Sequence, residues 1–254
     1  RDAQESRGLG DVYKRQIPIT PIKVDELQKA EFSQGNYMDR GELIEKEAGR
    51  LARVVDRGNS ELHKLLTFLI REILRNTPEH AKTNTMWVCG QYWPSYELAE
   101  IAIADEGIGI YNSITQNQAH KEYITNNKKA LQWALKAGIT EAFKPSMKHE
   151  SRDEWANSGF GLYMVNEICK HLNGSFCIIS YGNYILIDNH GIKYGETEFK
   201  GTAIGMRVPS KISNAQKIIS KISAQGEMQA RTIRNAFKNA SMPSKGLMSE
   251  LTIE

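Results

Sequence analysis

The chain has 254 residues, of which 40% are hydrophobic and 25% are charged, so it can bury a substantial core in one or two domains. The net charge of +3 is small, and Lys and Arg are spread along most of the chain, which argues against a nucleic-acid-binding protein. No apolar run approaches the roughly 20 residues that span a bilayer. The three cysteines form no CxxC pair. A soluble, cytoplasmic protein is therefore expected.

The first residues need separate treatment. The stretch SRGLGDVYKRQ, Ser6 to Gln16, resembles the translation of a transposon-end sequencing adapter. Residues 1–16 are therefore interpreted as a non-native leader and set aside from the fold, with a natural basic leader as the alternative. On this interpretation the natural N-terminus is missing, and an upstream sensor or receiver domain could precede the chain.

The next segments are predicted from their patterns in chain order. Residues 17–40 start with IPITPIKV, which indicates an edge strand or an arm, and residues 41–57 have the pattern of an amphipathic helix. Residues 17–58 are thus expected to form an N-terminal arm and helix. A stronger helical pattern, SELHKLLTFLIREILRN, begins at Ser60, which is the predicted N-cap.

Two β-rich runs, MWVCGQY and LAEIAIA, predict a hairpin over residues 86–104, and DEGIGI at 105–110 is a turn. Residues 111–158 are polar and irregular around one helical segment, KKALQWALKAG. The remaining expected elements are a helix at 161–172, strands near 175–181, 184–188 and 202–208, a polar helix at about 214–224, and a basic tail at 231–245. This order predicts an α/β (α+β) two-layer sandwich, with a mixed, mostly antiparallel sheet covered on one face by helices.

Two short motifs combine a polar side chain with a helix end or a turn. Glu72 and Asn76 are four residues apart at the end of the long helix, so both can face the same ligand. Asp105 follows a strand, and Gly107 and Gly109 after it form a turn that a ligand can approach closely.

Two further motifs follow. The run SGFGL, Ser158 to Leu162, leads into a helix, where glycines and the helix N-terminus let backbone N–H groups meet a phosphate. Gly201 and Thr202 lie at the start of the last strand, and Pro209 follows after six residues. Each motif alone is weak evidence for a nucleotide site, because it also occurs in proteins for structural reasons. The prediction rests on finding all four motifs in this order.

In this order the motifs resemble the N box, the two glycine boxes and the GT box of the GHKL superfamily, the ATPase fold shared by gyrase, histidine kinases and the heat-shock and MutL ATPases. The resemblance covers roughly Ser60 to Pro209. It implies a Bergerat-type ATP-binding domain over residues 59–210, followed by a C-terminal helix and basic tail over 211–254.

The resemblance also implies roles for single residues, with ATP and Mg²⁺ as cofactors. Asn76 would help to hold the metal, Asp105 would accept a hydrogen bond from the adenine amino group, and Thr202 would support the adenine side. Glu72 would be the catalytic residue that polarises an attacking water or hydroxyl. The implied cofactor-binding residues are Asn76, Asp105, Gly107, Gly109, Ser158, Gly159, Phe160, Gly161, Leu162 and Thr202.

Departures from the superfamily pattern refine the comparison. Sensor histidine kinases often carry a basic residue three positions after the N-box Asn, where this chain has Glu79. The run NTPEHA is closer to the N box of anti-sigma-type serine kinases and related stand-alone ATPases. Pro78 predicts a kink or an early helix end. His63 lies inside the N-box helix itself and is a poor phosphoacceptor.

The leading expectation is a regulatory kinase or ATPase that transfers or hydrolyses the γ-phosphate and acts on a protein partner. Three alternatives remain open. They are an ATP-gated conformational ATPase of the heat-shock or MutL kind, the catalytic half of a histidine kinase that lacks its phosphoacceptor domain, and a nucleotide sensor without turnover. A homodimer also stays open, and neither a membrane nor a nucleic acid is expected as partner.

Overall fold

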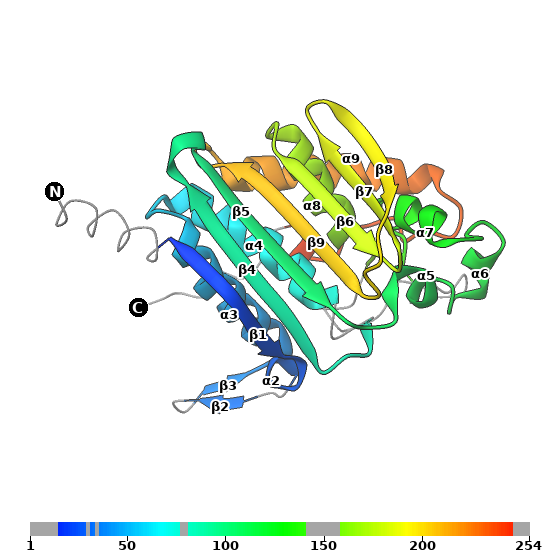
Figure 1. The fold of residues 1–254 in the computed structure, drawn as a ribbon, viewed down its shortest axis with the longest axis horizontal. Coiled ribbons are helices and arrows are strands. Elements are labelled where there is room, and N and C mark those ends of the chain that lie inside the picture. Colours follow the sequence, from blue (N-terminus) through cyan, green and yellow to red (C-terminus); the bar gives the residue numbers. More distant parts are fainter. Residues whose placement is uncertain (1–14, 29–30, 34–35, 77–80, 141–157, 246–254) are drawn as a thin grey trace, which may run out of the picture.

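A seven-stranded sheet forms one layer of the protein (Figure 1). The computed structural model describes residues 15–28, 31–33, 36–76, 81–140 and 158–245. The strands lie side by side in the order β1-β4-β5-β9-β6-β7-β8. Their bounds are β1 Gln16–Lys23, β4 Thr85–Trp93, β5 Leu98–Asp105, β6 Ser175–Ser180, β7 Asn183–Asp188, β8 Gly191–Glu196 and β9 Thr202–Pro209.

Every neighbouring pair in this sheet is antiparallel. The expectation of a mixed sheet was therefore wrong, since the described strands contain no parallel pair. The predicted hairpin of β4 and β5 is confirmed, with Met86 opposite Asp105 and Trp93 opposite Leu98. Strand β8 was not predicted, because nearly all of its residues are exposed and it has no alternation of apolar and polar residues.

Four helices form the second layer, on one face of the sheet (Figure 1). They are α3 Arg40–Val55, α4 Ser60–Asn76, α8 Gly161–His171 and α9 Ala215–Thr232. Helix α4 is buried along most of its length, and it packs against α3, α8 and α9. The predicted α/β sandwich with helices on one face is thus present. Helix α9 extends eight residues beyond its predicted end at about residue 224.

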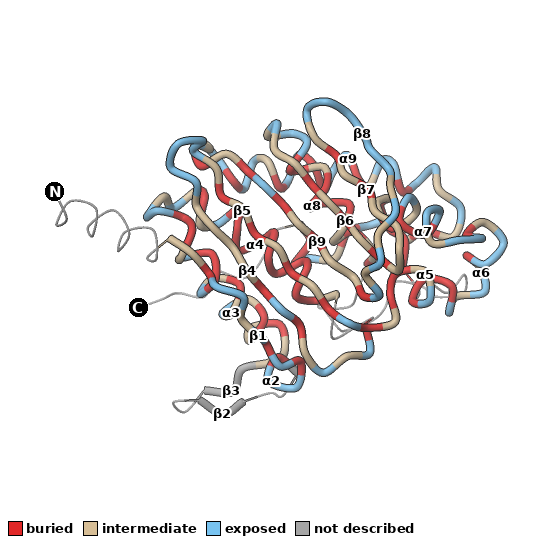
Figure 2. Tube along the Cα trace, in the orientation of Figure 1, coloured by how far each residue is buried: buried red, intermediate tan, exposed pale blue. Residues whose placement is uncertain are grey.

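A single hydrophobic core lies between the two layers (Figure 2). Strand β5 shows how the sequence produces it, because buried and half-buried residues alternate along the whole strand. The core runs from Ile17 in β1 to Ala240 after α9. The expected arm at 17–58, the central part at 59–210 and the described part of the tail therefore share one core.

The end of the expected leader continues the edge strand. Gln16 is the first residue of β1 and lies opposite Gln91, and Tyr92 N donates to Arg15 O at 3.0 Å. Residues 1–14 lie outside the described part of the chain.

Short elements complete the fold. They are α2 Val24–Gln28, the hairpin of β2 Glu31–Ser33 and β3 Asn36–Met38, the 3-10 helices η2 Pro94–Tyr96 and η3 Pro243–Lys245, and α5 Gly109–Ile114, α6 Gln118–Lys121 and α7 Asn127–Ala134. Helices α5 and α6 lie in a region that was expected to be irregular around α7 alone. None of the helices in the described ranges has the length and apolar character needed to cross a membrane.

The N-terminus of α4 is capped by Asn59 and not by Ser60. The Asn59 Oδ1 atom accepts hydrogen bonds from the backbone N of Glu61 and of Leu62, both at 3.0 Å. Ser60 is already inside the helix and its side chain is exposed. The sequence prediction was therefore wrong by one residue.

Replacing these two neighbours tests the capping assignment. Asn59→Ala removes the acceptor for two orphan N–H groups and should lower the free energy of unfolding by ~1 kcal/mol. Ser60→Ala should change it by less than about 0.5 kcal/mol, as is usual for an exposed position. Urea unfolding of both variants measures the difference, and an equal loss in both would contradict the assignment.

Candidate functional site

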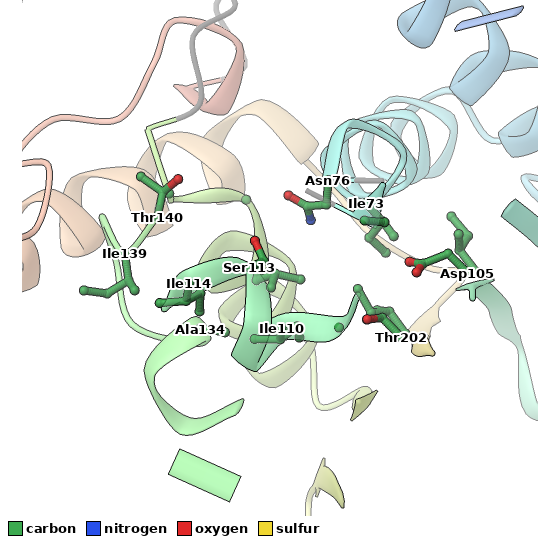
Figure 3. Close-up of a pocket in the computed structure, with 17 residues that line it drawn as sticks. Ile73, Asn76, Asp105, Ile110, Ser113, Ile114, Ala134, Ile139, Thr140 and Thr202 are labelled. Atoms are coloured by element: carbon green, nitrogen blue, oxygen red, sulfur yellow. The ribbon is translucent and has the colours of Figure 1, made fainter. Parts of the chain in front are cut away.

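A pocket opens between the ends of β5 and β9 and the helices around them (Figure 3). Its walls are mostly apolar with a few polar groups, which is the usual composition of a small-molecule site. Its lining residues are Ile73, Asn76, Ala81, Ile103, Asp105, Gly109, Ile110, Ser113, Ile114, Ala134, Ile139, Thr140, Gly159, Gly161, Leu162, Thr202 and Ile204.

Most of the residues from the four sequence motifs meet at this pocket. The motif residues that line it are Asn76, Asp105, Gly109, Gly159, Gly161, Leu162 and Thr202. Four others do not line it: Glu72, Gly107, Ser158 and Phe160. Residues separated by more than a hundred positions thus converge on one cavity, and each of the four outside it lies within two positions of a lining residue in the chain.

Asp105 and Thr202 lie together at one end of the pocket (Figure 3). Asp105 is the last residue of β5, Thr202 is the first residue of β9, and the antiparallel register places them opposite each other. Asp105 is buried, and its Oδ1 accepts from the backbone N of Gly107 at 2.8 Å. The sheet therefore holds a carboxylate and a hydroxyl at the same end of the cavity.

The turn after Asp105 has no room for side chains at its glycines. A Cβ on Gly107 would lie 2.1 Å from the Ala81 backbone O, and Ile108 N donates to that same oxygen at 2.8 Å. Gly109 has φ of 75°, and a Cβ there would lie 2.3 Å from the Tyr181 ring. Glycine lets this turn pack closely against its neighbours, and the turn then starts α5 along the pocket wall.

Asn76 is the last residue of α4 and points toward the middle of the pocket (Figure 3). Its Nδ2 atom is buried and finds no hydrogen-bond partner among the described residues. A buried amide nitrogen without a partner costs free energy, so this group favours a ligand that supplies one. The side chain also carries an acceptor oxygen, which suits a hard metal ion.

The N-terminus of α8 forms another part of the wall. Gly159 has φ of 69°, and a Cβ there would lie 2.6 Å from the Ile139 carbonyl carbon. Phe160, at the N-cap of α8, has no side-chain acceptor for the first N–H groups of the helix. The backbone from Gly159 to Leu162 therefore presents a helix N-terminus to the pocket, which is a favourable place for an anion.

The apolar wall was not predicted from the sequence. It consists largely of isoleucines from α4, β5, α5 and β9: Ile73, Ile103, Ile110, Ile114 and Ile204. Each looks like an ordinary core residue in its own element. Ile103 and Ile204 face each other across β5 and β9, so only the strand pairing reveals that they share the pocket floor.

Glu72 lies behind the pocket wall, where it is 2% exposed. Its Oε1 accepts from Arg71 Nη2 at 2.9 Å, and its Oε2 accepts from Ser244 Oγ at 3.1 Å. A Cβ on Gly161 would come within 3.0 Å of the same Oε2 atom. The carboxylate is therefore separated from the pocket by the side-chain-free backbone of Gly161.

Arg71 was not singled out in the sequence, yet it organises the surroundings of Glu72. It is 1% exposed, and its guanidinium also contacts Glu45 Oε2 at 3.0 Å and the Pro243 backbone O at 2.6 Å. Burial disfavours the charge, but attraction to Glu72 and Glu45 outweighs it and raises the pKa of Arg71 above its ordinary value. Arg71 therefore remains a cation and holds one face of Glu72.

Some sequence predictions lie outside the described residues. They concern Pro78 and Glu79, and residues 141–157 of the loop expected between Gly109 and Gly159. The described part of that loop, 109–140, forms α5, α6 and α7. Helix α4 ends at Asn76, two residues before Pro78.

The chain was compared with models of known protein families and with curated proteins. No family model matches it, and no curated protein matches it. The function is therefore inferred from the geometry of the pocket itself.

Two glycines with similar backbone conformations test how tightly the pocket wall is packed. Gly58 has φ of 74° with open space where a Cβ would stand, whereas Gly159 has φ of 69° and its Cβ would clash with Ile139. Gly58→Ala should cost roughly 1–2 kcal/mol, the penalty of a left-handed conformation for alanine. Gly159→Ala should lower the free energy of unfolding clearly more, as measured by denaturant unfolding. Similar losses in the two variants would show that the backbone around Ile139 can move to accommodate the extra methyl group.

Proposed function

We propose that this protein binds Mg·ATP in the pocket and that it is a GHKL-type ATPase or kinase module. The observation that carries the proposal is the arrangement of three groups around one apolar cavity. These groups are the Asp105 carboxylate at a strand end, the Asn76 amide nitrogen that has no partner among the described residues, and the N-terminus of α8. Each suits a different part of a nucleotide.

The end of the pocket at Asp105 suits adenine. Its isoleucine walls favour a flat, weakly polar ring, and the carboxylate can accept a hydrogen bond from the exocyclic amino group. Guanine carries a carbonyl at the corresponding position, so its oxygen would face the carboxylate oxygen without a proton between them. The pocket should therefore prefer adenine to guanine nucleotides.

The groups nearer α8 suit the phosphates. Backbone N–H groups from Gly161 onward and the helix dipole favour an anion, and the glycines leave space for close approach. Asn76 would supply an amide oxygen to Mg²⁺, and the metal would neutralise charge on the phosphate oxygens when bound.

The proposal extends to the chemistry of the γ-phosphate. Glu72 is one helical turn from Asn76 on α4, about 6 Å along the axis. A carboxylate at this distance is suited to orient a nucleophile toward the γ-phosphate. The product would be either free phosphate or a phosphorylated protein, and the module would work in the cytoplasm, where ATP is available.

Asp105→Ala should weaken ATP binding by about ten- to hundredfold, because it removes a charged hydrogen-bond partner worth roughly 1.5–3 kcal/mol. Glu106→Ala is the matched control, since Glu106 is the next residue and its side chain is exposed outside the pocket. Isothermal titration calorimetry with ATP and GTP measures both effects. Equal affinity of the parent protein for the two nucleotides would refute the role of Asp105.

Asn76→Ala should reduce the contribution of the metal to nucleotide affinity. The parent protein should bind ATP more tightly with Mg²⁺ than with a chelator, and the variant should lose most of that difference while retaining metal-free binding. Calorimetric titrations of ATP in the two buffers provide the comparison. A metal dependence that is unchanged in the variant would show that Asn76 does not contact the metal.

A further inference from the structure

A second groove lies at the β8 edge of the sheet, between β7, β8 and the helices α7 and α8. Strand β8 is the last strand of the sheet, and nearly all of its residues are exposed (Figure 2). The floor of the groove is formed by alternate residues of the two strands, Ile185, Ile187, Ile192 and Tyr194. Ile192 is 55% exposed and Tyr194 is 44% exposed. An exposed apolar strip with polar groups around it is typical of an interaction surface.

The groove also contains a buried hydrogen-bond acceptor. Asn166 of α8 lines the groove and is 4% exposed. Its Nδ2 donates to Glu167 Oε1 at 2.9 Å, which fixes the orientation of the amide. Its Oδ1 is buried and finds no hydrogen-bond partner within the described ranges. Because an unsatisfied buried acceptor costs free energy, this oxygen favours a ligand that carries an N–H or O–H donor.

Cations lie around the groove. Lys136 Nζ is 4.0 Å from the centroid of the Trp133 ring, and Lys128 Nζ is 4.9 Å from the centroid of the Tyr194 ring. Neither of these ammonium groups forms an ion pair with a carboxylate in the described part of the chain. A third lysine, Lys170, lines the groove and already forms an ion pair at 2.8 Å within α8. No Asp or Glu is among the described residues that line the groove, so its charge favours an acidic ligand.

The two helices beside the groove also form part of the pocket described above. In α7, Ala134 lines the pocket, whereas its neighbour Trp133 lines the groove. In α8, Leu162 lines the pocket, and Asn166 lines the groove one turn later. A ligand in the groove would therefore contact the same two helices that enclose the pocket.

We propose that this groove binds an acidic peptide segment of a protein partner and takes up one tyrosine side chain of that segment. The tyrosine ring would pack on the isoleucines of the floor, and its hydroxyl would donate to Asn166 Oδ1. Lys128 and Lys136 would contact the carboxylates on either side of the tyrosine. Tyrosine fits because its donor lies at the tip of an apolar ring, whereas phenylalanine has no donor and lysine would meet the cations. The inference goes beyond nucleotide binding and does not depend on it.

Short synthetic peptides test the proposal directly. A fluorescein-labelled peptide of sequence EDYDE is titrated with the full chain in the absence of nucleotide, and fluorescence anisotropy measures its affinity. It should bind about two- to tenfold more tightly than EDFDE, which lacks only the hydroxyl. The peptide KKYKK, with the flanking charges reversed, should bind more weakly than EDYDE by about tenfold or more. Equal affinity for EDYDE and EDFDE, or for EDYDE and KKYKK, would overturn the proposal.

Variants of the protein then locate the peptide. Asn166→Leu keeps the size of the side chain and removes the acceptor, so EDYDE should lose its advantage over EDFDE. Lys136→Glu should weaken the binding of EDYDE by about three- to tenfold. Lys129→Glu is the matched control, because Lys129 is exposed on α7 and does not line the groove. If Lys136→Glu and Lys129→Glu bind EDYDE equally well, the peptide binds elsewhere and the proposal fails.

A second copy of the chain is the competing occupant of the groove. Analytical ultracentrifugation of the parent protein and of Ile192→Asp distinguishes the two, because Ile192 is exposed on the floor of the groove and its replacement by a charge would disrupt an apolar contact there. The proposal expects the same oligomeric state for both proteins. A dimer of the parent that Ile192→Asp dissociates would assign the groove to self-association and overturn the peptide site.

Discussion

The buried ion pair of Arg71 and Glu72 is the constraint on which the site depends. Two charges that are almost fully buried must be satisfied on all sides, because losing one partner of such a pair costs roughly 3–5 kcal/mol. Here the additional partners are Glu45 from α3, the Pro243 carbonyl, the Ser244 hydroxyl and Arg75, whose Nη1 lies 3.7 Å from Glu72 Oε1. The pair therefore fixes α3, α4 and the C-terminal segment relative to one another.

Helix α4 transmits this constraint to the pocket. Asn76 follows Glu72 by one turn and reaches the cavity, whereas Glu72 faces the layer behind the wall. Gly161 lies between the pocket and the buried Glu72 carboxylate. Any side chain at this position would come too close to that carboxylate. A glycine at the start of α8 thus has two effects. It exposes backbone N–H groups to the pocket, and it leaves room for the Glu72 carboxylate on the other side of the backbone.

The sequence predicted the elements with strong patterns and missed features that depend on tertiary contacts. Strand β5 and helix α8 match their predicted ranges to within a residue, because their apolar periodicity is clear. The spacing of motifs around Asn76, Asp105 and Thr202 also predicted residues that do line one pocket. The contact of Ser244 with Glu72 joins residues 172 positions apart, and no local pattern signals it.

The buried position of Glu72 limits which nucleophiles can contact its carboxylate. Water could reach Oε2 only if Ser244 left it, and that displacement would also remove the Pro243 carbonyl from Arg71 and weaken a buried, charge-assisted contact. The network that satisfies the buried ion pair therefore keeps solvent away from the Glu72 carboxylate, and the contacts that stabilise the fold also control which groups can reach it.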